Sequence, residues 1–329
     1  MYRKLNLKTL AIVLVTLIAV VIAIYLSDSK KGERSFRAKM VDADTSKVTS
    51  MVIYPKAEKE NAIELEKVSE GWRVISGTNV YPADEIMIRN ILTVLADLKP
   101  QRLTATEKSR WGEFDVTDSS ATRVKLYTGK KLATHLYIGR FSYQPPKNQN
   151  PYNYGQQGTM STFVRLADEK SVYSVEGFLV MSFGRSVNDF RKKVVIQFNK
   201  EDLSKLSFTY PADSSFNLIK EGNQWTANGL ICDSALVAEY LNAISMLTSS
   251  YFVDDQEPLS RKADFTLNIE GNNFTSPIEL KAFKSDAINR YLISSSLNKG
   301  AYFSGQSNDL SNKIFVSKNK FLMGTDPLD

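Results

Sequence analysis

Apolar side chains recur along this chain with the spacing of an amphipathic helix, and they do so twice. In each case five apolar positions follow the spacing i, i+3, i+4, i+7 and i+10, which places them on one face of a helix. One offset of 149 residues relates all five pairs, so the two predicted helices belong to an internal repeat. The positions are Ile88, Ile91, Leu92, Leu95 and Leu98 in the first helix and Val237, Tyr240, Leu241, Ile244 and Leu247 in the second.

A β-hairpin of the same design is predicted before each helix. Residues 63–98 and 216–247 both begin with an alternating apolar segment, pass a turn that contains glycine, and continue into a strand that carries Trp72 or Trp225. Alternation with a period of two is typical of strands that bury one face. Each repeat therefore contains a hairpin followed by an amphipathic helix.

Further alternating segments predict the strands that complete each repeat. A terminal helix is expected over residues 177–193 of the first repeat. The second repeat holds only the start of the equivalent helix, at residues 320–323. The predicted fold class is α+β, with two tandem repeats over residues 40–193 and 194–329, each an antiparallel sheet with an amphipathic helix packed on it. The strands are expected near residues 44–55, 123–127, 132–139, 162–166 and 171–175 in the first repeat, and near residues 202–211, 265–269, 278–280, 290–293 and 313–317 in the second.

An uncharged apolar segment precedes the repeats. Residues 9–26 (TLAIVLVTLIAVVIAIYL) would extend about 27 Å as a helix, which matches the hydrocarbon core of a bilayer. We expect an uncleaved transmembrane helix that acts as a signal anchor; a cleaved signal peptide is the alternative, but no small-residue cleavage site precedes Ser27. Residues 1–8 are then a cytoplasmic tail, and residues 27–39 form a stem.

The excess positive charge of the chain lies beside this segment. Residues 1–39 carry eight Lys and Arg against two acidic residues, and the whole chain carries 42 against 36, so residues 40–329 are neutral overall. A neutral body gives no electrostatic footprint for nucleic acid, whereas the flanking charges suit lipid head groups. Flanking charge alone does not fix the orientation, but short N-terminal tails usually stay inside. We expect a single-pass protein of the bacterial inner membrane with its C-terminal body in the periplasm.

One segment interrupts the symmetry of the two repeats. Residues 142–160 (SYQPPKNQNPYNYGQQGTM) contain three Pro, two Gly and three Tyr without the period of a strand or a helix. Tyr143, Tyr152 and Tyr154 are candidate partner-contact residues, because tyrosine offers apolar area and a polar tip. The alternative is a hairpin tip without a binding role.

The side chains that carry chemistry are few and scattered. The only histidine, His135, is expected to face solvent from a strand, and the only cysteine, Cys232, is expected to be a small packed residue. Asp84 and Asp233 stand where an N-cap residue accepts the free amides of a first helical turn, which explains them better than a carboxylate pair does. The sequence therefore predicts no catalytic residue, no metal ligand and no cofactor-binding residue.

Several short motifs stand out in the first repeat: Gly71-Trp72-x-Val74, YPAD at residues 81–84, LxxL at residues 95–98, LYIG at residues 136–139, and FVRL with VYSVEGFL within residues 163–179. Together these motifs resemble the domain-of-unknown-function family 4340. Where that family usually has a Tyr-Gly-Leu segment after the helix, this chain has RWGEF at residues 110–114. The form with an N-terminal membrane helix is similar to Bacteroidetes members.

The resemblance also implies a partner. Such proteins are often encoded with ABC-2 type transporters of the gliding-motility kind, and no catalytic residues are established for them. We therefore expect a non-catalytic, membrane-anchored envelope protein that acts as an accessory subunit of such a transporter, with its permease or auxiliary subunits as partners. The alternative is an extracytoplasmic module that binds an envelope glycan or peptide, with Trp72 or Trp225 stacking on sugars rather than packing in the core.

Overall fold

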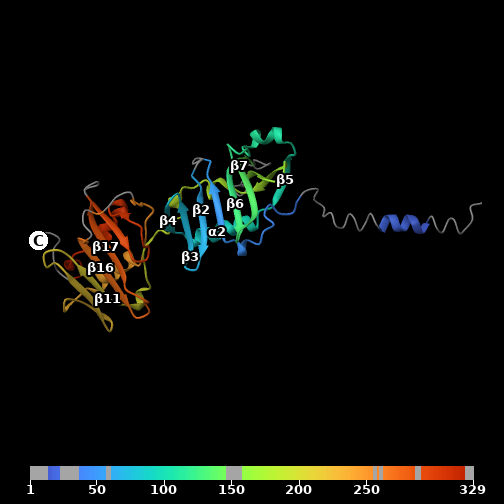
Figure 1. Cartoon of the computed structure of the whole chain (residues 1–329). Helices are drawn as coiled ribbons and strands as arrows, with labels where there is room; N and C mark the ends of the chain where they lie inside the picture. Colours follow the sequence, from blue (N-terminus) through green and yellow to red (C-terminus); the bar gives the residue numbers. More distant parts are fainter. Residues whose placement is uncertain are drawn as a thin grey trace, which may run out of the picture. The chain divides into compact units, whose positions relative to one another are not determined.

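A computed structural model of the chain describes residues 14–22, 37–56, 61–145, 158–254, 258, 262–285 and 290–322 (Figure 1). Within these residues the chain is mostly β with some helices. The strands form three antiparallel sheets of nine, two and eight strands. The chain divides into two compact units, one holding Met1–Lys47, Leu92–Lys125 and Leu132–Phe183, and the other holding Val48–Ile91, Leu126–Lys131 and Gly184–Asp329. The predicted division at residues 193 and 194 stays a prediction.

The nine-stranded sheet has the order β4-β3-β2-β1-β6-β7-β8-β9-β5. Its first hairpin pairs Val68 with Gly71, and Gly71 has a φ of +122°, a backbone angle that side chains rarely tolerate. The strands are β1 (Ser50–Tyr54), β2 (Ile63–Val68), β3 (Gly71–Ser76), β4 (Asn79–Pro82), β5 (Pro100–Ala105), β6 (Thr122–Thr128), β7 (Lys131–Gln144), β8 (Thr159–Leu166) and β9 (Val172–Glu176).

The eight-stranded sheet repeats this order. It reads β14-β13-β12-β11-β16-β17-β18-β19, so each strand has a counterpart at the same place in the first eight strands of the larger sheet. A separate two-stranded sheet of β10 (Val194–Gln197) and β15 (Met246–Thr248) is not among the sequence predictions. The strands of the eight-stranded sheet are β11 (Leu203–Thr209), β12 (Phe216–Glu221), β13 (Gln224–Ala227), β14 (Leu230–Ile231), β16 (Phe265–Gly271), β17 (Ile278–Ser285), β18 (Arg290–Ser295) and β19 (Phe303–Ser304).

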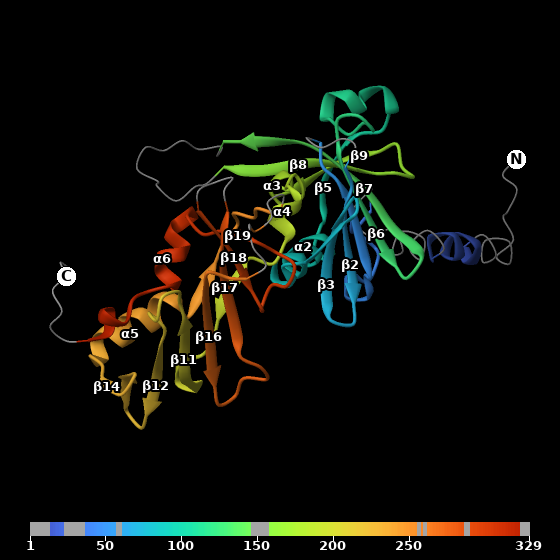
Figure 2. The same ribbon diagram turned by 60° about the vertical axis from the view of Figure 1, so that its left-hand side comes forward.

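The two predicted amphipathic helices are present as α2 (Glu85–Ala96) and α5 (Ser234–Ile244). In α5 the predicted face is buried at Val237, Tyr240, Leu241 and Ile244. These side chains join the core of the eight-stranded sheet, and Figure 2 shows α5 beside β11 and β12. Burial of four large apolar side chains contributes roughly 8 kcal/mol as an upper bound, which is ample to dock the helix. The fifth predicted position of each helix, Leu98 or Leu247, lies past the helix end.

Asp84 and Asp233 cap these helices, as the sequence predicts. The Asp233 carboxylate accepts the amides of Ala235 and Leu236 at 2.7 and 3.2 Å, and the Asp84 carboxylate accepts the amide of Met87 at 3.0 Å. Each cap satisfies amide hydrogens that have no partner inside the helix. Both aspartates therefore have a structural role at equivalent places.

The helix expected over residues 177–193 is a wrong prediction. The segment forms two short helices, α3 (Val180–Phe183) and α4 (Val187–Phe190). Asp189 accepts the backbone amide of Ser186 at 2.9 Å, and this capping contact begins a new helix after Gly184. Phe183 of α3 and Phe190 of α4 are both buried, so the sequence keeps a helix-like spacing of apolar residues although the helix itself is broken.

The strand expected at residues 313–317 is also wrong. Helix α6 (Leu310–Ile314) and the short 3₁₀ helix η5 (Lys318–Phe321) occupy this part of the chain. At the end of α6 and just after it, the carbonyls of Ile314 and Val316 accept hydrogen bonds from the hydroxyls of Tyr240 and Tyr210. Ile314 and Val316 are buried while Phe315 is half-buried, and this local alternation explains the strand-like sequence pattern.

The second repeat holds more than the start of the terminal helix. Residues 186–190 (SVNDF) and 317–321 (SKNKF) share Ser, Asn and Phe at equal spacing. The carbonyl of Phe190 accepts the amide of Asp84, and the carbonyl of Phe321 accepts the amide of Asp233, both at 2.8 Å. The same contact therefore joins this segment to the capped helix in both halves. The other 3₁₀ helices are η1 (Thr45–Lys47), η2 (Lys108–Phe114), η3 (Lys200–Asp202) and η4 (Ser307–Asp309).

The predicted membrane segment, residues 9–26, lies partly outside the described residues. Residues 14–22 are helical, and their apolar side chains are exposed. Among the helices of the described residues, none has the length and apolar character needed to cross a bilayer.

Candidate functional site

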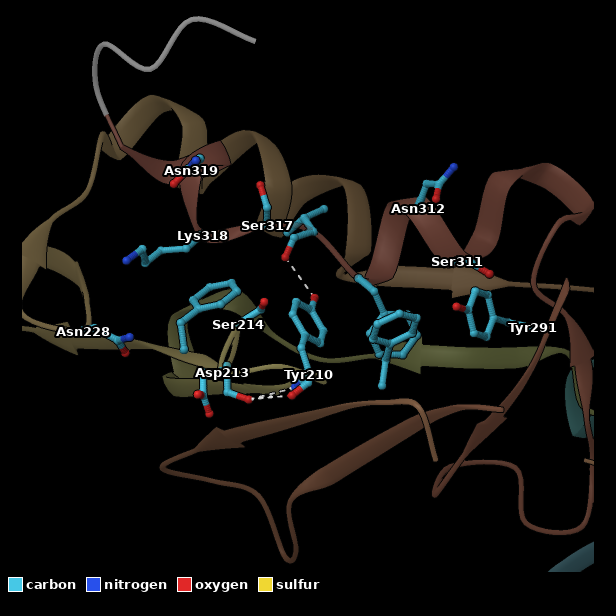
Figure 3. A pocket seen from close by; sticks show the side chains of 15 residues that line it. Tyr210, Asp213, Ser214, Asn228, Tyr291, Ser311, Asn312, Ser317, Lys318 and Asn319 are labelled. Carbon is cyan, nitrogen blue, oxygen red and sulfur yellow. Dashed lines mark hydrogen bonds between the residues drawn. The ribbon is translucent and has the colours of Figure 1, made fainter. Parts of the chain in front are cut away.

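A pocket of about 520 Å³ opens beside the core of the eight-stranded sheet (Figure 3). This volume lies within the range of typical ligand pockets, about 300–1,000 Å³. We call it the aromatic pocket, because four of its lining rings are half-buried rather than fully buried: Tyr210, Phe265, Tyr291 and Phe315. The other lining residues are Asp213, Ser214, Ser215, Phe216, Asn228, Ser311, Asn312, Val316, Ser317, Lys318 and Asn319.

The rings of the aromatic pocket are held in fixed positions. Tyr210 stands in the middle of the pocket in Figure 3, and its hydroxyl donates to the carbonyl of Val316 at 2.9 Å. The Tyr210 ring meets Phe265 edge to face, with centroids 5.2 Å apart, and Phe265 lies 5.0 Å from Tyr291. Burial raises the pKa of Tyr210, so this hydroxyl stays protonated and remains a donor. The rings of Tyr210, Phe265 and Tyr291, which we call the ring row, are therefore preorganised.

The polar groups at the edge of the aromatic pocket are mostly neutral. Figure 3 places Asn228, Asp213 and Lys318 on one side of Tyr210, and Tyr291 and Asn312 on the other. The lining contains one acidic and one basic residue, so the two formal charges balance. Amide and hydroxyl groups supply both donors and acceptors.

A second candidate surface lies where β7 and β8 run together. Tyr143 pairs with Met160 across the two strands, and Phe141 lies two residues before Tyr143, so the three side chains share one face. Their exposed fractions are 50% for Phe141, 52% for Tyr143 and 47% for Met160. We call these three residues the β7–β8 surface. Of the predicted contact residues, Tyr143 belongs to this surface, while Tyr152 and Tyr154 lie outside the described residues.

The expectation that His135 faces solvent is wrong. His135 is half-buried, and its Nε2 has no hydrogen-bond partner among the described residues. Burial lowers the pKa of His135 to about 4, and the nearby cations Lys125 and Arg123 act in the same direction. The neighbouring Tyr137, whose ring centroid lies 4.9 Å from that of His135, is buried on the same face.

The segment that follows β5 explains why this face is covered. Trp111 in η2 and Tyr137 lie on the guanidinium of Arg165, with that group 3.6 and 3.9 Å from the two ring centroids. Arg165 also donates to the carbonyls of Val116 and Leu166. The charge is thus buried with aromatic and hydrogen-bonding partners, as a buried cation requires. The alternation of the strand could be predicted from the sequence, but nothing in the local pattern indicates this cover.

Within the described residues, neither Trp72 nor Trp225 lines one of the described pockets. Trp225 is buried in the core of the eight-stranded sheet, and Trp72 is half-buried. Cys232 is buried, as predicted, and burial raises the pKa of its thiol. In the part of the chain that the structure describes, no group of three or more His, Cys, Asp and Glu side chains could hold a metal ion.

A buried ion pair near β4 is another feature that the sequence pattern missed. The Arg191 guanidinium pairs with Asp254 and lies between the rings of Tyr81 and Phe252, 3.6 and 3.7 Å from their centroids. Only 2% of Arg191 is exposed. Burying a charge this deeply is costly without such partners, so the cluster has a structural role.

The described part of the chain is thus mostly β, with two large antiparallel sheets, and the eight-stranded sheet borders the aromatic pocket. A comparison with protein-family models finds a match over residues 72–264, from β3 to the residue before β16, which is more than half of the chain. The chain belongs to the family described as domain of unknown function (DUF4340). Neither the curated proteins nor the solved structures contain a significant match to it.

Proposed function

We propose that this protein is a non-catalytic, membrane-anchored envelope protein that acts as an accessory subunit of an ABC-2 type transporter. The observation that carries the proposal is the β7–β8 surface, where two aromatic side chains and a methionine are exposed together. Exposed clusters of this kind mark protein-interaction sites, and aromatic residues and Met are enriched in them. The partner would be a permease or auxiliary subunit of the gliding-motility-like class.

The anchor in this proposal is residues 9–26, whose uncharged apolar length matches a bilayer core. It would hold the protein as a single-pass component of the bacterial inner membrane, with the body in the periplasm. The two sheets then serve as tandem α+β repeats of one scaffold. Their equal strand order and the paired caps Asp84 and Asp233 support that duplication.

A pull-down from native membranes in mild detergent tests the accessory role. Tagged wild-type chain is expected to recover transporter subunits, whereas the double variant Phe141→Ser and Tyr143→Ser should lose most of that recovery. Both side chains are about half exposed, so the variant should fold. The matched control is Met246→Ser, which changes a side chain that is 70% exposed on β15. Absence of transporter subunits from the wild-type sample would refute the role.

A second function is favoured by the aromatic pocket. We infer that the eight-stranded sheet forms part of an extracytoplasmic module that binds an envelope glycan or peptide. The support is a pocket of ligand-binding size with fixed rings and neutral polar groups at its edge.

Thermal unfolding tests the binding module, because a ligand that binds only the folded state raises the unfolding temperature. Oligosaccharide and peptide fractions from the cell envelope should stabilise the wild-type chain. They should not stabilise Ser214→Trp, which places a large ring from an exposed loop into the pocket. Equal stabilisation of both proteins would place the binding elsewhere and remove this function from the pocket.

A further inference from the structure

The lining of the aromatic pocket indicates which class of ligand would bind there. The inference that follows rests on the ligand-binding function proposed above. We infer that the pocket binds a neutral oligosaccharide, with sugar rings lying on the row formed by Tyr210, Phe265 and Tyr291. A sugar ring has an apolar face of C–H bonds and an edge of hydroxyl groups. The pocket offers a matching combination of aromatic surface and amide or hydroxyl groups.

The shape of the ring row supports a chain of sugars rather than a small apolar molecule. Tyr210 and Phe265 are 5.2 Å apart between centroids, and Phe265 and Tyr291 are 5.0 Å apart, so Phe265 contacts both other rings and the three form one connected aromatic surface. Figure 3 places polar side chains at both ends, with Asn228 on one side and Asn312 on the other. A ligand that covers the row therefore meets hydrogen-bonding groups at each end.

The charges of the lining disfavour an ionic ligand. Lys318 and Asp213 are the basic and the acidic residue of the lining, and their formal charges cancel. A phosphate or sulfate group would lose its hydration here and gain a single cation in return. The same reasoning applies to a polycation, because one carboxylate is present.

The strands beside the pocket disfavour an extended peptide. Peptides commonly bind a sheet by adding a strand to a free edge. The strands that supply lining residues are β12, β16 and β18, and each pairs with a strand on both sides: β12 with β11 and β13, β16 with β11 and β17, and β18 with β17 and β19. These three strands are therefore interior to the sheet, so recognition relies on side chains rather than on strand addition.

Calorimetric titration of the full-length chain in detergent tests the ligand class. The probes are cellohexaose, maltohexaose and the hexamer of N-acetylglucosamine, with a sulfated heparin hexasaccharide and a neutral hexapeptide as comparisons. At least one neutral oligosaccharide is expected to bind the wild-type chain more tightly than both comparison probes. Tyr291→Ala should weaken that binding about tenfold or more, equivalent to about 1.4 kcal/mol.

Two further variants keep the test interpretable. Ser214→Trp blocks the pocket from an exposed loop and should abolish the binding. Tyr251→Ala removes a tyrosine that is 53% exposed and does not line the pocket, so its affinity should equal that of the wild-type chain.

The outcomes separate this inference from the function on which it rests. If the hexapeptide or the sulfated sugar binds more tightly than every neutral sugar, and Ser214→Trp removes that binding, the binding module stands and the glycan class is wrong. Absence of binding by all five probes, together with envelope fractions that fail to stabilise the chain, would overturn both.

Discussion

The imidazole of His135 is held where its charged form is disfavoured. Its folded pKa is lowered to about 4 by burial, below the value of 6.5 expected in the unfolded chain. Between these values the unfolded state binds more protons than the folded state, so stability rises with pH in that window. This contribution is fully present above about pH 6.5 and is lost as the pH falls towards 4.

We therefore expect His135→Gln to reduce the acid sensitivity of the fold. The measurement is the urea midpoint of wild-type and variant chains at about pH 7 and about pH 5. The midpoint of the wild-type chain should fall more between these two conditions than that of the variant. Because His135 is the only histidine, no other imidazole contributes to the difference. Equal changes in both proteins would show that His135 is not held in its neutral form.

At the scale of single elements, the side chains of Asp84 and Asp233 stabilise α2 and α5 by accepting amides of the first helical turn. Asp233→Ala removes two hydrogen bonds to the first turn of α5 and should lower the free energy of unfolding by about 1 kcal/mol. Asp84→Ala should have a similar effect through α2. Glu239→Ala, on the exposed side of α5, is the matched control and should change stability by less than about 0.5 kcal/mol.

Urea unfolding of the three variants measures these effects directly. A change of stability in Glu239→Ala as large as in Asp233→Ala would contradict the capping role. The comparison of Asp84→Ala with Asp233→Ala also tests whether the two helices contribute alike.

Elements defined by local periodicity could be predicted from the sequence, whereas elements defined by distant contacts could not. The faces of α2 and α5 and the hairpins before them follow spacing within one segment. The strand expected at residues 313–317 fails because the carbonyls of Ile314 and Val316 accept tyrosine hydroxyls from Tyr240 and Tyr210. Those tyrosines lie far away in the sequence, so no local pattern reveals them.

The candidate site was less predictable than the fold for the same reason. The sequence points to Tyr143 as a candidate contact residue because an irregular, tyrosine-rich segment interrupts the repeat. The aromatic pocket is assembled from five separate segments, and its rings belong to strands or to segments read as strands, where aromatic side chains usually indicate core. The density of Phe and Tyr after residue 207 is the one signal that could have pointed to it.

At the scale of the whole molecule, two sheets of matching strand order carry two different candidate surfaces. The strand order and the helix caps agree between the two sheets. The β7–β8 surface belongs to the nine-stranded sheet, and the aromatic pocket belongs to the eight-stranded sheet. In the proposed accessory protein, the first surface contacts the transporter and the second binds a ligand. Substitutions that abolish one interaction should therefore leave the other intact.

Site-specific photocrosslinking in living cells tests the partner surface most directly. A photoreactive phenylalanine analogue replaces Tyr143, and in a parallel strain it replaces Met246, an exposed residue of β15. We expect position 143 to crosslink to a polytopic ABC-2 type transporter subunit, and we expect no such crosslink from position 246. Absence of such a crosslink from position 143, or crosslinks of equal yield from both positions, would contradict the proposal that this chain joins a transporter through the β7–β8 surface.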